Sequence, residues 1–398
     1  MSITAKAQLA GAALGLAGQV ASERVRRGPA PTTLSEVPAS AEDLTPPWLT
    51  AALCRRHPGA KVVDVSLRGG SNGSTSRRGI TLTYNDVGRE AELPTQIFTK
   101  STPSLTSRLV VGPTGLLASE SAFYTTVRPT LDIEVAQGYY TTVDQRSYRS
   151  MFLLEDVGVT RGAKFGDPSS MPVSKKMAES QVDLLAGLHG GTWDSPLFAT
   201  RPGWLRNVQD MMVSINALAN FKTGALGAGI KRSADVLPAE LLRHRDRLWP
   251  SYMRSLELNT VAPMSLLHND VHLGNWYRAE DGTMGLYDWQ TFAQGFWAKD
   301  FAYALGSALT IDDRRAWEQE LLERYLARLA DDGGPKLTFE QGWLAYRQQT
   351  FHGFFFWLFT IGAGRLQPDM QPRHISLENL SRMGQQVVDL ESVAAIDA

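Results

Sequence analysis

The sequence contains a single cysteine, Cys54, among 398 residues. One cysteine excludes a disulfide within the chain and a structural zinc site of the cysteine type. Because disulfide-rich chains belong to oxidising compartments, this composition predicts a protein of a reducing compartment, and hence a cytoplasmic location. Cys54 is predicted to be a small, half-buried residue and not a nucleophile.

The sequence also lacks an excess of charge and a long apolar run. Its 40 Lys and Arg residues nearly balance 41 Asp and Glu residues, giving a formal net charge of -1, so we expect no nucleic-acid partner. No run of 18 or more apolar residues occurs, so we predict no membrane span. The Ala- and Gly-rich stretch from Lys6 to Ala21 predicts a weak amphipathic helix that packs on the body or lies at an interface.

The distribution of prolines and of strand patterns divides the chain into three parts. Prolines gather between residues 28 and 47, which predicts an extended linker, with the folded body starting near Trp48. Alternating patterns predict strands at 61–67, 79–84, 94–100 and 149–156, whereas helical patterns prevail after residue 160. We therefore predict an α+β chain with an N-terminal helix and linker (1–47), a small antiparallel-sheet lobe (48–157) and a larger, mainly helical lobe (158–398).

The most specific pattern is HNDVHLGN at 268–275, followed by LYDWQ at 286–290. Asp270 and Asn275 have the spacing of the catalytic loop H-R-D-x-x-x-x-N of kinases, which a metal-binding Asp follows. Phosphoryl transfer needs a base for the attacking hydroxyl, and Asp270 is the predicted catalytic carboxylate. Mg²⁺ prefers oxygen ligands, and we predict Asn275 and Asp288 as its ligands.

Three features of the strand-rich lobe would serve a nucleotide. A polar loop between two predicted strands could offer backbone N–H groups and hydroxyls to phosphates. Lys100 ends the third predicted strand, and Glu120 in the next predicted helix could hold it by an ion pair. The residues of the loop predicted to contact the nucleotide are Gly70, Ser71, Asn72, Gly73, Ser74 and Thr75.

These motifs resemble the aminoglycoside phosphotransferase superfamily, and more narrowly its ecdysteroid-kinase-like and choline-kinase-like branch. The resemblance covers roughly residues 60–310 and rests on the loop at 69–75, Lys100, Glu120, LLED at 153–156, LHGGTW at 188–193, HNDVHLGN and YDWQ. It implies a protein-kinase-like fold, ATP with Mg²⁺, and a small-molecule alcohol as the acceptor. It also implies that residues 153–157 form a hinge whose backbone groups at Glu155 and Val157 read the adenine.

The acceptor is less defined than the nucleotide site. Asp288 is followed by Trp289 and Gln290, and no Ala-Pro-Glu element follows, which argues against a protein substrate. The segment FHGFFFWLF at 351–359 predicts a buried core helix, one face of which could line an apolar pocket. The carboxylates Glu318, Glu320 and Glu323 are predicted to form a solvated helix face. An apolar or amphipathic alcohol is therefore expected in preference to an aminoglycoside, and aromatic walls are expected from Trp276, Trp289, Phe292, Phe296 and Trp297.

Two other functions fit parts of the sequence. A metal-dependent hydrolase could use His268, Asp270, His272 and Asp288 as ligands, but it would leave Lys100 and the glycine-rich loop unexplained. A nucleotide-binding protein without activity could share the scaffold, since fold alone does not establish catalysis. The sequence leaves the oligomeric state and the choice between ATP and GTP open.

Overall fold

The computed structural model describes residues 30–72, 75–112, 114–167, 170–200, 202–212, 224–261, 264–363 and 371–398, with Gly15, Leu16, Gly18 and Val20. The chain divides into two compact units. The first comprises Met1–Thr130 and Val135–Ala163, and the second comprises Leu131–Glu134 and Lys164–Ala398. Most of the helix predicted between Lys6 and Ala21 lies outside the described residues.

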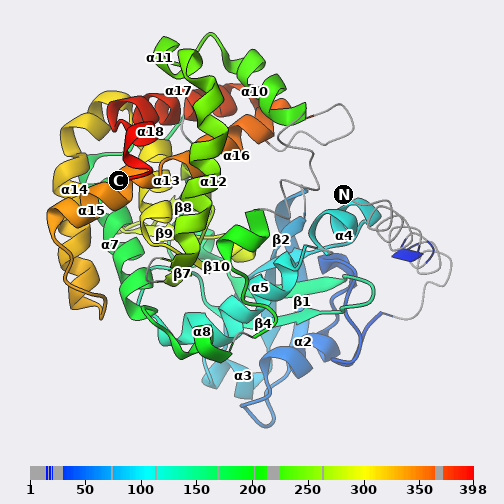
Figure 1. Ribbon diagram of the computed structural model, residues 1–398. Coiled ribbons are helices and arrows are strands. Elements are labelled where there is room, and N and C mark those ends of the chain that lie inside the picture. Colours follow the sequence, from blue (N-terminus) through cyan, green and yellow to red (C-terminus); the bar gives the residue numbers. More distant parts are fainter. Residues whose placement is uncertain are drawn as a thin grey trace. The chain divides into compact units, whose positions relative to one another are not determined.

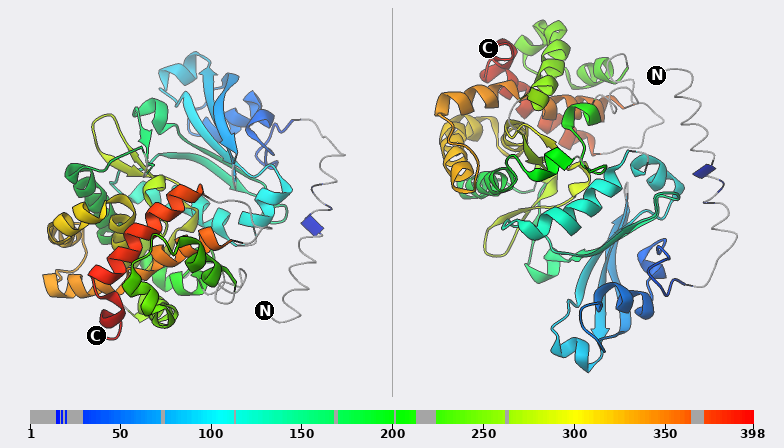
Figure 2. Two further views of the ribbon diagram at one scale, coloured as in Figure 1. Left: turned by 90° about the horizontal axis from the view of Figure 1, so that it is seen from above. Right: turned by 60° about the horizontal axis from the view of Figure 1, so that its bottom comes forward.

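The first unit is built on a five-stranded antiparallel sheet of order β1-β2-β3-β5-β4 (Figure 1). Its strands are seen at another angle in Figure 2, in blue to green. Alternating β-branched and polar residues favour these strands, and the polar stretch between β1 and β2 lets the chain reverse. The bounds are β1 Val62–Asn72, β2 Ser76–Tyr84, β3 Gln96–Ser101, β4 Gly138–Val143 and β5 Ser150–Glu155.

The register of β2, β3 and β5 separates their side chains into two faces. Ile97 of β3 and Ile80 of β2 are cross-strand partners, and both join the hydrophobic cluster that includes Trp48. Gly79 pairs with Phe98, and Arg77 pairs with Lys100. Successive residues of a strand point to opposite faces of the sheet, so these pairs lie on the face opposite the pair of Ile80 and Ile97. Gly79, Phe98 and Lys100 therefore share the face opposite this cluster, which we call the Lys100 face.

Short helices accompany the sheet of the first unit. Helix α2 begins with prolines, and the side chain of Thr45 caps it by accepting a hydrogen bond from the Trp48 N–H, a favourable start for a helix. The bounds are η1 Ala41–Asp43, α2 Pro46–Leu53, α3 Asp86–Glu90, α4 Leu105–Val111, α5 Leu116–Ala122, the π-helical turn η2 Phe123–Val127, η3 Arg128–Thr130 and α6 Val157–Thr160.

The segment predicted as a linker packs onto the first unit from Leu34 to Leu44. Leu44 is buried in the hydrophobic cluster, and Leu34 and Val37 pack against it. The indole Nε1 of Trp48 donates a hydrogen bond to the backbone oxygen of Glu36 at 2.9 Å. The linker prediction is wrong for this stretch. Its apolar side chains lie among the prolines, and burying them against the first unit is more favourable than leaving them exposed to water in an extended chain.

The second unit is mainly helical. It contains a three-stranded antiparallel sheet of order β6-β8-β9 and a two-stranded pair of β10 and β7. Its strands are β6 Lys164–Phe165, β7 Ser265–Leu267, β8 Trp276–Arg278, β9 Met284–Leu286 and β10 Ala293–Gly295. Its helices are α7 Lys175–Gly191, α8 Pro196–Thr200, α10 Leu226–Ser233, α11 Ala239–Arg243, α12 Arg245–Val261, η5 Leu273–Asn275, η6 Trp289–Thr291, α13 Ala298–Ala308, α14 Ile311–Asp331, α15 Phe339–Gln348, α16 Phe351–Gly362, α17 Arg373–Asp389 and α18 Ser392–Ala395.

Stacked aromatic rings fill the core of the second unit. The rings of Trp297 and Tyr325 stack with centroids 4.7 Å apart, and those of Tyr252 and Phe355 with centroids 4.3 Å apart. Such rings bury large apolar areas. The predicted solvated face of α14 is wrong for Glu318, which is buried because its carboxylate accepts hydrogen bonds from Arg314 at 2.6 Å and from Tyr346 at 2.8 Å.

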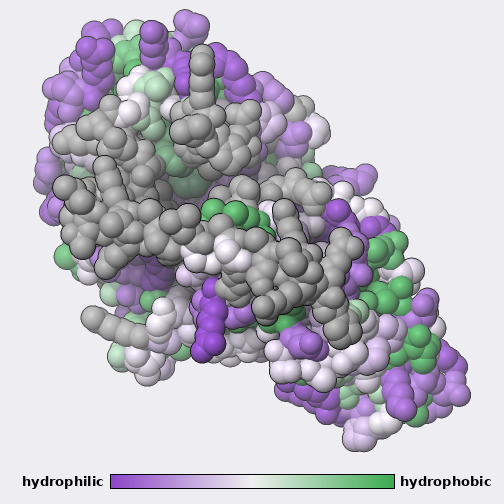
Figure 3. Space-filling model, turned by 90° about the vertical axis from the view of Figure 1, so that its right-hand side faces the viewer, coloured by the Kyte–Doolittle hydropathy of each residue, from purple (hydrophilic) through white to green (hydrophobic). Residues whose placement is uncertain are grey.

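The exposed surface carries few large apolar side chains. In the view of Figure 3, hydrophobic residues form small groups among hydrophilic ones. Among the described residues, the most exposed large apolar side chains are Val261 of α12, Val63 of β1 and Val159 of α6. Within the described ranges, no helix has both the length and the apolar composition needed to cross a membrane.

The architecture agrees with the fold class expected from the sequence. A unit built on a small antiparallel sheet precedes a larger, mainly helical unit. The prediction of an α+β fold, with a small antiparallel-sheet part and a larger, mainly helical part, is confirmed.

Candidate functional site

The predicted catalytic carboxylate lies in a short loop between β7 and η5 of the second unit. The side-chain nitrogen of Asn275 donates hydrogen bonds to the backbone oxygen of Asp270 at 2.8 Å and to Asp270 Oδ2 at 3.1 Å. The hydroxyl of Tyr303 donates to Asp270 Oδ1 at 3.3 Å. The Asp270 side chain keeps 15% of its surface exposed, so it is oriented by its neighbours and still open to a reactant.

A buried carboxylate on α13 fixes the backbone of this loop. Asp300 accepts hydrogen bonds from the backbone N–H groups of His268 at 2.8 Å and of Asn269 at 3.0 Å. Asn269 has a φ of 72°, a left-handed conformation that Asn adopts more readily than most residues. Fixing two consecutive N–H groups determines the direction of the chain as it enters Asp270.

The pKa of Asp300 is lowered from its ordinary value although burial alone would raise it, because His189 and Lys299 stabilise the charged form. Nε2 of His189 lies 3.6 Å from Asp300 Oδ2. The other ring nitrogen, Nδ1, is 2.7 Å from the Tyr325 hydroxyl. The carboxylate therefore stays ionised inside the core, where it is a strong acceptor for the loop.

His268 joins the loop to the segment that carries Asp288. Its Nε2 donates to the backbone oxygen of Tyr287 at 2.9 Å, and its Nδ1 accepts from the backbone N–H of Asp270 at 3.3 Å. Burial lowers the pKa of His268, which agrees with a neutral ring that donates at one nitrogen and accepts at the other. His268 therefore supports the shape of the loop.

The β8–β9 hairpin brings Asp288 back toward Asn275. The backbone N–H of Tyr287 donates to the backbone oxygen of Asn275 at 3.0 Å, which continues the pairing of Trp276 with Leu286. Asp288 has a φ of 64°, so the chain turns sharply just after the hairpin. The two predicted metal ligands thus sit at the same end of one hairpin, and both offer oxygen atoms.

A buried lysine also contacts the loop. Lys299 is fully buried, and its Nζ contacts both the side-chain oxygen of Asn269 and its backbone oxygen, the latter at 3.4 Å. Nε2 of His352 on α16 is 3.3 Å from the same backbone oxygen. Burial lowers the pKa of Lys299 to about 7, against the opposing effect of Asp300 and Asp270.

In the first unit, Lys100 and Glu120 form the predicted ion pair. Nζ of Lys100 lies 2.8 Å from each oxygen of the Glu120 carboxylate. The exposed fractions of the two side chains are 4% and 1%. A buried pair with such geometry fixes the direction of both side chains. The pairing is observed, and the role of the two residues in nucleotide binding stays a prediction.

The glycine-rich loop is described only in part. Gly70 and Ser71 belong to β1, whereas Gly73 and Ser74 lie outside the described residues, as does the side chain of Asn72. At Gly70 an added Cβ would come within 2.1 Å of the Arg77 oxygen, so only glycine fits there. Thr75 is buried, and its hydroxyl has no hydrogen-bond partner in the part of the chain that the structure describes.

The predicted hinge begins at the last residue of β5. The backbone N–H of Glu155 donates to the backbone oxygen of Gln137 at 2.8 Å. A hydrogen bond from a nucleobase to the backbone of Glu155 would therefore use its carbonyl oxygen. The Glu155 carboxylate binds Arg161, with 2.6 Å between Oε2 and Nη2. Val157 is buried and starts α6, where the first N–H groups of a helix have no acceptor within that helix.

Comparison with known proteins adds a family to this geometry. The model of the phosphotransferase enzyme family matches residues 112–347, which is more than half of the chain. The chain belongs to the phosphotransferase enzyme family. The matched range includes Glu120, Asp270, Asn275 and Asp288, and it confirms the prediction of an enzyme that transfers phosphoryl groups. No curated protein matches the sequence of this phosphotransferase.

Several solved structures resemble this phosphotransferase at low identity. A microcompartment-associated aminopropanol kinase has 15% identity and a TM-score of 0.42, with 85% of this chain and 94% of that chain covered. A choline kinase from Streptococcus pneumoniae has 13% identity and a TM-score of 0.44, covering 82% and 94%. An ethanolamine kinase from Plasmodium vivax has 8% identity and a TM-score of 0.46, covering 83% of each.

The sequence pattern indicates no role for several residues that lie around the predicted catalytic loop. Asp300, Lys299 and Tyr303 come from α13, His189 from α7 and His352 from α16. A polar residue on the apolar face of a helix was the available signal, as for His189 among the leucines of α7. Such a signal shows that a partner is needed, but it does not identify the partner.

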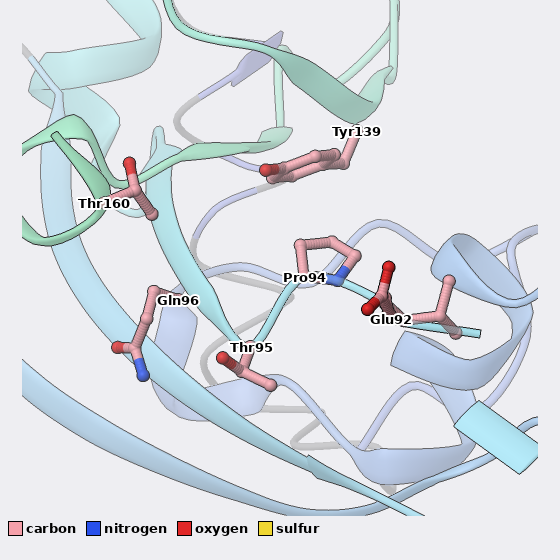
Figure 4. A pocket seen from close by; sticks show the side chains of 7 residues that line it. Glu92, Pro94, Thr95, Gln96, Tyr139 and Thr160 are labelled. Carbon is pink, nitrogen blue, oxygen red and sulfur yellow. The ribbon is translucent and has the colours of Figure 1, made fainter. Parts of the chain in front are cut away.

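The expected aromatic walls of an acceptor pocket are mostly core. Trp276, Trp289 and Phe292 have exposed fractions of 0%, and Trp297 has 1%, so the prediction is wrong for these four. A hollow of about 430 Å³ in the first unit is lined by neither Lys100 nor the glycine-rich loop. Figure 4 shows the Tyr139 ring above Pro94 in this hollow, with Thr160, Gln96, Thr95 and Glu92 around it.

Proposed function

We propose that the protein is an ATP- and Mg²⁺-dependent phosphotransferase that phosphorylates a hydroxyl group of a small molecule. The observation that carries the proposal is Asp270, held by Asn275 and Tyr303 with its carboxylate still partly open. In this proposal, Asp270 orients the acceptor hydroxyl and takes its proton at a carboxylate oxygen. Asn275 and Tyr303 prevent the carboxylate from rotating away.

The donor set of the second unit fits Mg²⁺. Because the nitrogen of the Asn275 amide is directed at Asp270, its oxygen is directed elsewhere and can serve a cation. Asp288 supplies a carboxylate at the same end of the hairpin, and oxygen atoms of these two kinds are the ligands that Mg²⁺ prefers. When bound, Mg²⁺ would neutralise phosphate charge.

The first unit supplies groups suited to a nucleotide. Lys100 on its sheet face is directed by Glu120 and could contact the α- and β-phosphates. The residues predicted to surround the phosphates are Gly70, Ser71, Asn72, Gly73, Ser74 and Thr75. The Thr75 hydroxyl, which has no partner among the described residues, could donate a hydrogen bond to a phosphate oxygen. Backbone groups of Glu155 and Val157 would contact the base, as the family resemblance implies.

The acceptor is proposed to be an apolar or amphipathic alcohol. Helix α16 lies beside the catalytic loop, because His352 contacts the Asn269 oxygen and the Trp357 ring lies 5.5 Å from the His272 ring. Phe356 and Phe359 on this helix are half-buried, so they offer apolar surface that a ligand could cover. Glu318 is engaged by Arg314 and Tyr346, which removes one carboxylate that a polycationic aminoglycoside could use.

The hydrolase alternative finds less support in the geometry. Both ring nitrogens of His268 take part in hydrogen bonds, to Tyr287 and from Asp270, so neither is available to a metal. Over the described ranges, no group of three or more His, Cys, Asp or Glu side chains is arranged to hold a metal ion.

The test is nucleotide consumption with Mg²⁺ across a panel of acceptors. The panel contains aminoglycosides, macrolides, choline-like amines, sterols and simple aromatic alcohols, and wild type is compared with Asp270→Ala. Asp312→Asn, on the exposed start of α14, is the matched control. ADP release that depends on an apolar alcohol and disappears only in Asp270→Ala supports the proposal. ATP binding without turnover of any acceptor would favour a binding protein, and turnover of kanamycin-type sugars alone would overturn the acceptor class.

A further inference from the structure

An ion pair on the sheet of the first unit joins two segments distant in sequence. Nη2 of Arg68, within β1, lies 2.5 Å from Oδ2 of Asp156, directly after β5. Arg68 immediately precedes the glycine-rich loop, and Asp156 separates Glu155 from Val157. The pair therefore connects the loop proposed to cover the phosphates with the segment proposed to contact the base.

The position of the pair is defined by Gly79 of β2. A Cβ at Gly79 would lie 3.0 Å from Arg68 Cζ, 3.1 Å from Arg68 Nη2 and 3.3 Å from Asp156 Oδ2. The guanidinium and the carboxylate therefore lie directly over Gly79. Because Gly79 is the cross-strand partner of Phe98, the pair lies on the Lys100 face of the sheet.

The pair is also partly open. The Arg68 side chain keeps 31% of its surface exposed and the Asp156 side chain 14%. One Arg68 nitrogen is also 3.5 Å from the Ile80 oxygen, so the guanidinium is held at its edge. A planar cation held at its edge leaves a face of its plane available for stacking.

We propose that the Arg68 guanidinium, oriented by Asp156, is a stacking surface for the purine base of the nucleotide. The inference rests on the proposed function, because it assumes that the Lys100 face receives the nucleotide. Gly79 leaves room that a larger residue at this position would fill, and Arg68 occupies it with a flat cation. Guanidinium groups stack on aromatic rings through cation–π attraction. Since every base has a π-face, the contact should not distinguish adenine from guanine.

The test is the dissociation constant of the full-length protein with Mg²⁺ for ATP, for GTP and for inorganic tripolyphosphate. Arg68→Met is expected to weaken ATP and GTP by about tenfold each, and to leave tripolyphosphate, which has no base, unchanged within about twofold. The matched control is Arg89→Met, which breaks an exposed ion pair with Asp86 in the same unit and should change none of the three constants. Arg68→Lys keeps a cation beside Asp156 but lacks the plane, and is expected to lose several-fold in ATP and GTP affinity. It provides the test if Arg68→Met does not fold.

The outcomes separate this inference from the proposed function. If wild type binds neither ATP nor GTP, the proposed function fails together with the inference. If wild type binds a nucleotide and Arg68→Met or Arg68→Lys binds it equally well, stacking is overturned while the proposed function stands. Equal loss for ATP and tripolyphosphate would overturn it too, because the pair would then act through the shape of the phosphate loop.

Discussion

The amide nitrogen of Asn275 lies 3.1 Å from Oδ2 of Asp270 and 2.8 Å from the Asp270 backbone oxygen. One side chain thus orients the predicted catalytic carboxylate with its nitrogen and leaves its oxygen for a cation. The two tasks are linked, because rotation of the amide would exchange nitrogen for oxygen in both directions.

Asn275→Ala is therefore expected to impair both tasks. We expect kcat to fall by about a hundredfold, and the Mg²⁺ concentration for half-maximal rate to rise by about tenfold. A Mg²⁺ titration of the steady-state rate at saturating ATP measures both. A lower kcat with an unchanged Mg²⁺ requirement would show that Asn275 only orients Asp270 and is no ligand.

The buried Lys100–Glu120 pair predicts separable effects on stability and on nucleotide binding. Lys100→Met leaves the Glu120 carboxylate buried without its cation, which should cost about 3 kcal/mol of unfolding free energy. The double variant Lys100→Met with Glu120→Gln removes that unpaired charge and should recover most of the stability, but its ATP affinity should stay about tenfold or more below wild type.

Urea unfolding and ATP titration of wild type, both variants and the exposed control Lys61→Met check this prediction. If the double variant recovers ATP affinity as well as stability, Lys100 has a structural role only and does not contact the phosphates.

The hydrogen bonds of Asp300 to the catalytic loop suggest that neutralising this carboxylate will affect both stability and catalysis. Asp300→Asn keeps the size of the side chain but weakens the acceptor for the His268 and Asn269 N–H groups. We expect a loss of about 3 kcal/mol in unfolding free energy, since hydrogen bonds to a buried charge are stronger than neutral ones. We also expect kcat to fall at least tenfold with the KM for ATP nearly unchanged, because Asp270 would be less well oriented.

Unfolding in urea and steady-state kinetics test the Asp300 variant beside Asp331→Asn, an exposed position on α14. A stability loss without any change in kcat would mean that the loop keeps its shape without the carboxylate.

Local spacing explains which parts of the site the sequence could predict. Asp270, Asn275 and Asp288 lie within one loop and one hairpin, so their order along the chain nearly determines their placement. The Lys100–Glu120 pair followed from the succession of a strand and a helix. By contrast, the contact of Arg68 with Asp156 joins residues 88 positions apart, and the contact of His352 with Asn269 joins residues 83 apart. No local period indicates such partners, because they depend on how whole elements pack. Packing of Leu34 and Leu44 was missed for the same reason.

Lys299 predicts a pH dependence of stability with a definite sign. Burial lowers its pKa in the folded protein to about 7 from an ordinary value of 10.5, while Asp300 and Asp270 act in the opposite direction, and His352 is the further titratable group that contacts the same Asn269 oxygen. Between these two pKa values the unfolded chain binds a proton that the folded protein does not. The unfolding free energy contributed by Lys299 should therefore rise with pH in this window, by up to about 1.4 kcal/mol per pH unit.

Lys299→Met removes the titrating group and should remove this slope. Urea unfolding at about pH 6, 7, 8 and 9 gives the difference in unfolding free energy between wild type and variant. We expect that difference to be nearly constant below about pH 7 and to shift in favour of wild type above it. Above this pH, Lys299 of the folded wild type loses its proton, so the cost of burying a charged group disappears, whereas the variant has no such group at any pH. A difference that stays constant up to about pH 9 would mean that Lys299 remains protonated in the folded protein, with the buried carboxylates Asp300 and Asp270 outweighing desolvation.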